Sequence, residues 1–103
     1  MIFVLGSVVA QAGQHDEVLR LSQEHVARSS AEPGCIAHAV HQDTENPLRL
    51  VFVEQWASQE ALWAHFKVPA SRAFVRALAG LAVGAPDMAL YEAAQFAVPG
   101  RAT

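Results

Sequence analysis

One histidine combines the right chemistry with the right surroundings for catalysis. His65 lies in the segment Ala61-Leu62-Trp63-Ala64-His65-Phe66. Imidazoles titrate near neutral pH, so a histidine can accept a proton from a substrate as a general base. In a helix, His65 shares a face with Leu62 and Phe66, which is the apolar face expected to meet a sheet. This placement predicts a catalytic base beside apolar surface, although a histidine that only hydrogen-bonds at a helix end has the same spacing.

Four further polar side chains are candidates for the same site. Glu54 is flanked by apolar residues, and a carboxylate on a covered face needs a partner or a raised pKa. It either binds substrate or forms an ion pair at a strand end or dimer interface. His38 lines either the pocket or the dimer face, and Tyr91 offers a hydroxyl to the pocket. His25, on the apolar side of a helix, either packs there or reaches a pocket beneath it.

Aromatic residues are expected to form the walls of this pocket. Four of them occur on the elements around His65: Phe52, Trp56, Phe66 and Phe74. Such rings make an apolar cavity that orients a substrate and excludes water. Trp56, like Trp63, also fits a purely structural place in the core.

No motif in the chain predicts a metal or a cofactor. His38 and His41 are three apart on a predicted strand, so they point to opposite faces and cannot share an ion within one subunit. The sequence has no Gly-rich phosphate loop, no clustered Cys/His set and no Gly-x-Ser-x-Gly elbow. We therefore expect no metal, flavin or nucleotide.

The elements that hold these residues follow from periodicity and turn residues. Pro33-Gly34 suits a type II turn, Ser58 suits a helix N-cap and Pro69 interrupts a helix. The patterns predict strands over about 2–10, 35–42, 48–56 and 87–95, and helices over about 15–31, 58–68 and 70–81. A short polar loop, 43–47, joins the two middle strands as an antiparallel hairpin.

This order predicts an α+β fold of the ferredoxin-like βαββαβ type, with helices on one face of a four-stranded antiparallel sheet. Strands 2–10 and 48–56 are apolar on both faces. The helix-free face therefore needs a cover, and the simplest is the same face of a second copy, giving a homodimer. We expect one domain over 1–97 and a flexible tail over 98–103.

Composition narrows the possible partners and location. The seven basic residues are scattered and the net charge is −3, which disfavours nucleic-acid binding. No apolar run reaches the roughly 18 residues needed to span a bilayer, so we expect no membrane partner. The single cysteine, Cys35, allows no internal disulfide, which fits a cytoplasmic location.

Together these residues resemble the antibiotic biosynthesis monooxygenase (ABM) domain family, which includes quinol monooxygenase-like proteins. The matching residues are Glu32-Pro33-Gly34-Cys35, His41, Asp43, Pro47, Glu54, Trp56, Ala61-Leu62, His65-Phe66, Phe74 and Tyr91. The resemblance implies a dimeric α/β barrel with a pocket between sheet and helices in each subunit. The haem-degrading branch uses an asparagine, a tryptophan and a histidine where this chain has Ser7, His65 and Leu78, which counts against haem degradation.

The resemblance implies a cofactor-independent monooxygenase that oxidises a small quinol or phenol with dioxygen. His65 is the expected base. One alternative is a non-redox barrel, an isomerase or a binding protein for a small aromatic or carbonyl ligand. Another is a dimerisation module without a ligand.

Overall fold

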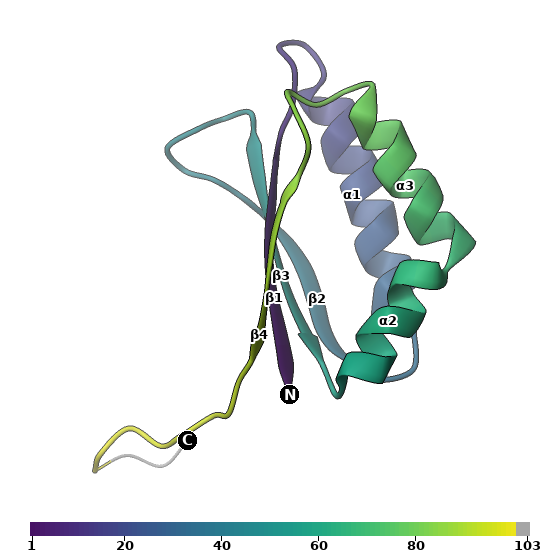
Figure 1. Cartoon of the computed structure of the whole chain (residues 1–103). Coiled ribbons are helices and arrows are strands. Elements are labelled where there is room, and N and C mark those ends of the chain that lie inside the picture. The colour runs from purple at the N-terminus through teal and green to yellow at the C-terminus, as the bar shows by residue number, and fades with distance from the viewer. Residues whose placement is uncertain (101–103) are drawn as a thin grey trace.

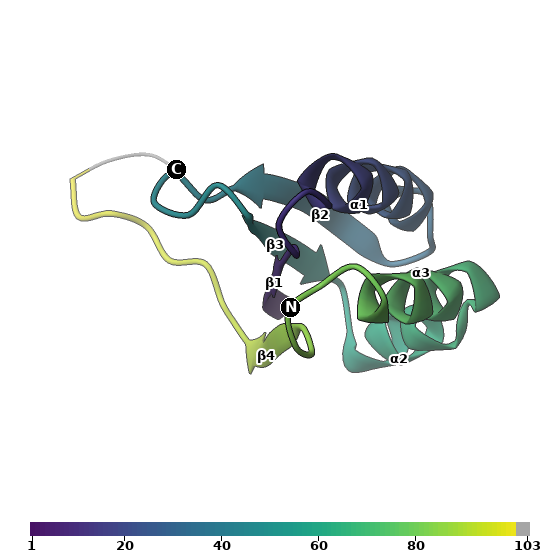
Figure 2. The same ribbon diagram turned by 90° about the horizontal axis from the view of Figure 1, so that it is seen from above.

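The computed structural model describes residues 1–100, which form an antiparallel sheet with helices on one of its faces (Figure 1). The elements are β1 Ile2–Val9, α1 His15–Ser30, β2 Cys35–Gln42, β3 Arg49–Trp56, α2 Gln59–Lys67, α3 Pro69–Ala79 and β4 Asp87–Glu92. The strands lie in the spatial order β2-β3-β1-β4. Seen from above, α1 lies beside β2, with α3 next to it and α2 below α3 (Figure 2). The predicted ferredoxin-like α+β fold is confirmed.

The element boundaries differ from the predicted ones mainly at their ends. Strand β4 stops at Glu92 instead of 95, because Glu92 pairs with Ile2, the first residue of β1, and no strand continues beyond it. Helix α3 starts at Pro69, one residue earlier than predicted, since proline lacks only an N–H that the first turn of a helix leaves unpaired. It ends at Ala79, before Gly80.

Local chemistry fixes the connections on either side of the candidate site. The Cys35 N–H donates to the Glu32 carbonyl at 3.1 Å, and Gly34 has a φ of 80°, so Pro33 and Gly34 form the predicted type II turn. At the start of α2, the Ser58 hydroxyl accepts from the Ala61 N–H at 3.2 Å, which confirms Ser58 as the N-cap.

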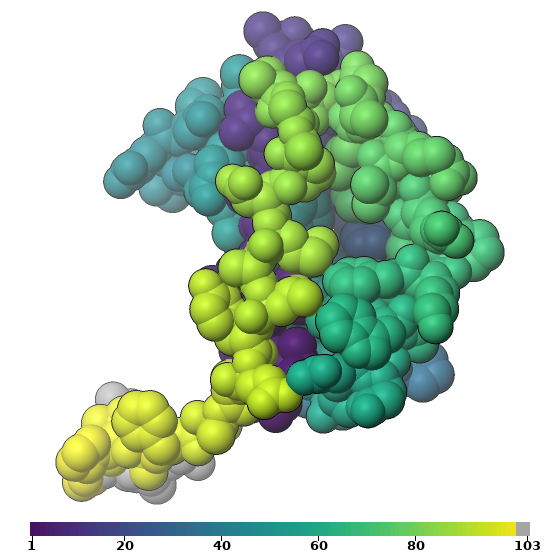
Figure 3. All heavy atoms as spheres, in the orientation of Figure 1, coloured from purple at the N-terminus to yellow at the C-terminus, as the bar shows by residue number. Residues whose placement is uncertain are grey.

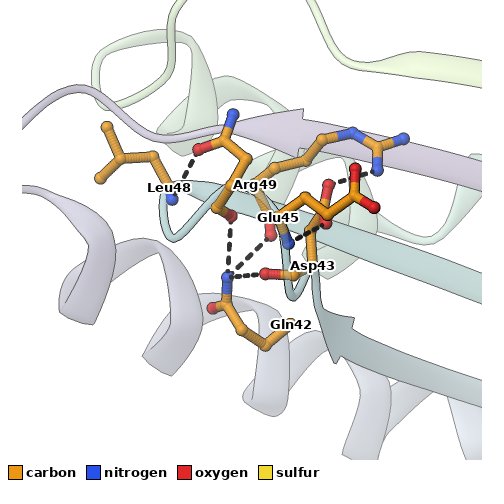
Figure 4. Close-up of polar contacts among 6 residues, drawn as sticks. Gln42, Asp43, Glu45, Leu48 and Arg49 are labelled. Carbon is orange, nitrogen blue, oxygen red and sulfur yellow. Dashed lines mark hydrogen bonds and ion pairs between the residues drawn. The ribbon is translucent and has the colours of Figure 1, made fainter.

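The loop between β2 and β3 is held by its own polar side chains (Figure 4). The Gln42 amide donates to the carbonyls of Asp43, Asn46 and Arg49 at 3.0–3.1 Å. The Asp43 carboxylate accepts from the Glu45 N–H at 2.8 Å and pairs with Arg49 at 3.0 Å. These contacts set the hairpin register, in which His38 on β2 pairs with Glu54 on β3.

Two apolar clusters lie between the sheet and the helices. The larger one includes Val8, Val18, Leu50, Phe52, Phe74 and Leu78. The smaller one consists of Ile2, Val4, Trp56 and Leu62. Alternate residues of β1 and β3 face away from the helices, and all of these except Ser7 stay partly exposed, with Leu5 at 44%. The single chain thus leaves an apolar sheet face without a cover, as the pattern predicted.

Within residues 1–100, no helix combines the length and apolarity that a membrane crossing requires. After β4 the chain runs on to residue 100 without a helix or strand, extending away from the sheet in Figure 1. The predicted tail, 98–103, lies partly outside the described residues, and the domain boundary at 97 stays a prediction.

Candidate active site

Three histidines from three different elements meet between the sheet and the helices. His25 comes from α1, His38 from β2 and His65 from α2, and their exposures are only 6%, 6% and 4%. Their ring centroids are 5.2, 5.4 and 5.7 Å apart. The trio lies between the two apolar clusters, because His25 stacks on Phe74 at 4.2 Å and His65 contacts Trp56 at 4.6 Å. We call these three residues the histidine cluster.

His65 is oriented by a carboxylate from the type II turn. Its Nδ1 lies 2.9 Å from Glu32 Oε1, and both side chains are largely buried. An ionised carboxylate only accepts hydrogen bonds, so Nδ1 carries the proton and Nε2 is left as the basic nitrogen. This carboxylate–imidazole pair is the arrangement that orients a general base.

Gly34 brings the turn close enough to α2 for this contact. A Cβ placed on Gly34 would lie 2.5 Å from the Cβ of Ala61, which is four residues before His65 on the same face of α2. Glycine is therefore needed twice, for its φ of 80° and for the close approach. The turn that marks the fold also positions Glu32 on His65.

Glu54 lies beneath the cluster with two polar neighbours. Its carboxylate accepts from the Trp56 indole N–H at 2.9 Å and lies 3.3 Å from His38 Nε2, in reach of an ion pair but not aligned for a hydrogen bond. Burial acts to raise the pKa of Glu54, but the contacts with His38 and Trp56 outweigh it and hold that pKa below its usual value. Glu54 is therefore an anion at neutral pH.

His25 is neutral at neutral pH. Burial, together with the neighbouring His38 and His65, lowers its pKa from 6.5 to about 3. Among residues 1–100, neither the His25 Nδ1 nor either ring nitrogen of His38 has a hydrogen-bond partner. A buried polar group without a partner costs roughly 1–3 kcal/mol. The buried Nδ1 atoms of His25 and His38, which have no partner, therefore lower the stability of the folded protein.

A cavity of about 420 Å³ opens beside the cluster. Its walls come from β1, β3 and all three helices, and its rim from residues 86–88 at the start of β4. Figure 3 shows the surface hollowed between β4 and the helices α2 and α3. The polar side chains that reach it from inside include His25, Glu54 and His65. Its size fits a small aromatic molecule.

Five of the predicted site residues meet at this cavity. His65 and Glu54 line it, together with the aromatic rings of Phe52, Phe66 and Phe74. The structure thus combines a buried imidazole, a carboxylate and apolar walls, as the spacing predicted. Whether these residues bind substrate stays a prediction.

The other three predicted residues lie elsewhere. Trp56 is fully buried and supports Glu54 and His65 from behind, so it takes the structural place that was the alternative. His38 is not at the cavity wall but contacts His25 and His65 on the helix side of the sheet, away from the helix-free face. Tyr91 pairs with Phe3, lies on the helix-free face and is 52% exposed, so it does not line this cavity, and a substrate-binding role for it stays a prediction.

Two residues of the site lie outside the predicted set. The sequence leaves His25 open between packing and a pocket, and the structure places it at the cavity wall. Its signal was the helical phase it shares with Val18 and Ser22, both fully buried. Glu32 was interpreted only as part of a turn, and no local pattern indicates its contact with His65.

The topology and the pocket define the chain as a ferredoxin-like α+β protein with a site between sheet and helices. Comparison with known proteins makes this specific. The family model for antibiotic biosynthesis monooxygenase matches residues 1–77, so the chain belongs to the ABM family.

Solved structures agree on the fold. A protein of Deinococcus radiodurans, provisionally assigned as an antibiotic biosynthesis monooxygenase, superposes with a TM-score of 0.90 at 22% identity, covering 95% of this chain and 97% of that one. Protein PA3566 of Pseudomonas aeruginosa gives 0.83 at 23% identity, covering 91% and 94%. The uncharacterized protein sll1783 of Synechocystis is 29% identical over 94 residues, which are 91% of this chain. The match spans only 64% of the length of sll1783.

Proposed function

We propose that the protein is a monooxygenase that oxidises a small electron-rich aromatic, a quinol or a phenol, with dioxygen and without a flavin or metal. The observation that carries this proposal is His65, buried at the wall of an apolar cavity with Nδ1 held by Glu32. Its Nε2 is then the atom that takes the substrate proton.

The reaction balances without another reductant. A quinol that loses its proton to His65 becomes electron-rich enough to pass one electron to dioxygen, and the two radicals combine as a peroxide. Loss of water from the peroxide leaves one oxygen atom in the product and one in the water. The net change is quinol plus dioxygen to hydroxyquinone plus water. The apolar walls of Phe52, Phe66 and Phe74 exclude bulk water from these intermediates.

We further infer that a second copy covers the helix-free face, giving a homodimer. This face carries Leu5, Tyr91, Val51 and Val53, all apolar or amphipathic and only partly buried in one chain. An apolar sheet face of this kind is typical of an interface between identical subunits. Family membership supports the same arrangement.

The test is oxygen uptake with quinols and anthrone-like phenols by the wild type, His65→Ala and, as control, His41→Ala on the exposed face of β2. Removing a general base lowers such a rate by about 100-fold or more, so uptake should be lost in His65→Ala and kept in His41→Ala. Equal uptake by His65→Ala would refute the assigned role. Thermal stabilisation by these aromatics without oxygen consumption would favour the non-redox isomerase or binding protein instead.

A further inference from the structure

The histidine cluster has the composition of a transition-metal site. One ring nitrogen from each of His25, His38 and His65 lies within 4.8 Å of the other two, and all three side chains are buried. Imidazole is a ligand that suits Zn²⁺, Co²⁺, Ni²⁺ and Cu²⁺. His38 and His41 cannot share an ion, but the fold brings His38 together with histidines from two helices instead.

Two ring nitrogens of the cluster are available to coordinate an ion. In the part of the chain that the structure describes, Nδ1 of His25 and Nδ1 of His38 are buried without hydrogen-bond partners, while Nε2 of His38 lies 3.3 Å from the Glu54 carboxylate. His65 Nδ1 lies 2.9 Å from Glu32, which leaves Nε2 as the nitrogen of His65 that can bind an ion. A carboxylate on the far nitrogen of a histidine is the usual outer partner of a metal ligand.

The ring nitrogens of the three histidines need to move only slightly closer together to bind one ion. Nitrogens that bind one tetrahedral Zn²⁺ at about 2.1 Å lie about 3.4 Å from one another. The cluster, at up to 4.8 Å, therefore needs ring movements on the order of 1 Å. The cavity, lined by His25 and His65, supplies the access route and leaves room for a fourth ligand.

We propose that His25, His38 and His65 bind one divalent transition-metal ion, with the fourth coordination position facing the cavity. The proposal goes beyond the proposed oxidation and does not depend on it. The two are linked through one atom, because Nε2 of His65 is the base in the metal-free protein and a ligand in the metal-bound one. Bound Zn²⁺ therefore blocks proton transfer and inhibits the oxidation.

The test titrates chelator-treated full-length protein with Co²⁺ and follows visible absorption, without any substrate. The wild type should bind one Co²⁺ per chain with the intense bands of tetrahedral cobalt, and Zn²⁺ should displace it. His25→Phe and His38→Gln should each weaken binding by at least about 100-fold, and Glu32→Gln by about 10- to 100-fold. His41→Ala and His15→Ala, which remove an exposed and a partly buried histidine outside the cluster, should bind as the wild type does.

Absence of tetrahedral cobalt bands in the wild type would overturn the proposal, as would equal loss of binding in His41→Ala. Far-UV circular dichroism reports whether each variant is folded. If a core variant unfolds, imidazole ¹⁵N NMR of the wild type during Zn²⁺ titration decides instead, since only the cluster signals should shift. The oxidation is tested separately, because cobalt binding is measured with no quinol present.

Discussion

Gly34→Ala is expected to destabilise the protein through a steric clash with Ala61, which control variants can separate from the backbone cost. The added methyl group would lie 2.5 Å from Ala61 Cβ, and the residue would keep a φ of 80° that L residues avoid. Left-handed backbone costs an alanine roughly 1–2 kcal/mol, and overpacking adds roughly 1–3 kcal/mol. The expected loss in free energy of unfolding is therefore about 2–5 kcal/mol.

Gly13 provides the matched control. It has a φ of 83° but nothing within 4 Å of an added Cβ, so Gly13→Ala measures the backbone cost alone. Its expected loss is about 1–2 kcal/mol. Ala61→Gly removes the atom that Gly34→Ala would strike, so the double variant should recover about 1–3 kcal/mol relative to the sum of the single losses.

Urea denaturation of the four variants gives these free energies, and NMR of the His65 imidazole reports the contact with Glu32. We expect Gly34→Ala to weaken that contact because the turn must move away from α2, whereas Gly13→Ala leaves it intact. Equal losses for Gly34→Ala and Gly13→Ala, or no recovery in the double variant, would refute the argument that close approach positions Glu32.

Two further predictions concern pH and assembly. The pKa of His25 is about 3 in the folded chain against 6.5 when unfolded, so stability is complete above pH 6.5 and falls as the pH falls through this window. Between pH 7.5 and 5 the free energy of unfolding should fall by about 2 kcal/mol. Urea denaturation should show this fall in the wild type and in the core control Val18→Ala but not in His25→Phe. The same fall in His25→Phe would count against the role of His25. Leu5→Lys should give a monomer in analytical ultracentrifugation while Trp63→Lys, similarly exposed on α2, stays dimeric; a monomeric wild type would contradict the dimer.

The parts of the fold that sequence reasoning predicted well depend on local chemistry. Pro33-Gly34 makes its turn through φ angles that these two residues prefer, and Ser58 caps α2 through an atom three residues away. Such signals act within one turn of chain and do not need the rest of the protein. The order of elements, and hence the fold, follows from them.

The site depended on information that local patterns do not carry. The sequence predicts Tyr91 in the pocket, but both faces of β4 mix apolar residues with one acidic residue, so alternation does not say which residues face the helices. The register with β1 decides it by pairing Tyr91 with Phe3. The meeting of His25, His38 and His65 likewise needs helix packing and strand register together, and each histidine alone has an ordinary structural explanation.

The contact between Glu32 and His65 depends on both a local turn signal and long-range packing. Glu32 belongs to the turn that marks the fold, and His65 belongs to a helix that lines the cavity. Because Gly34 lets that turn touch α2, the same backbone geometry that starts β2 also holds Nδ1 of His65 on a carboxylate and leaves Nε2 as its other nitrogen. In the oxidation and the metal site that we propose, Nε2 takes the substrate proton or binds the ion. On these proposals the turn sets the reactivity of the site as well as the topology.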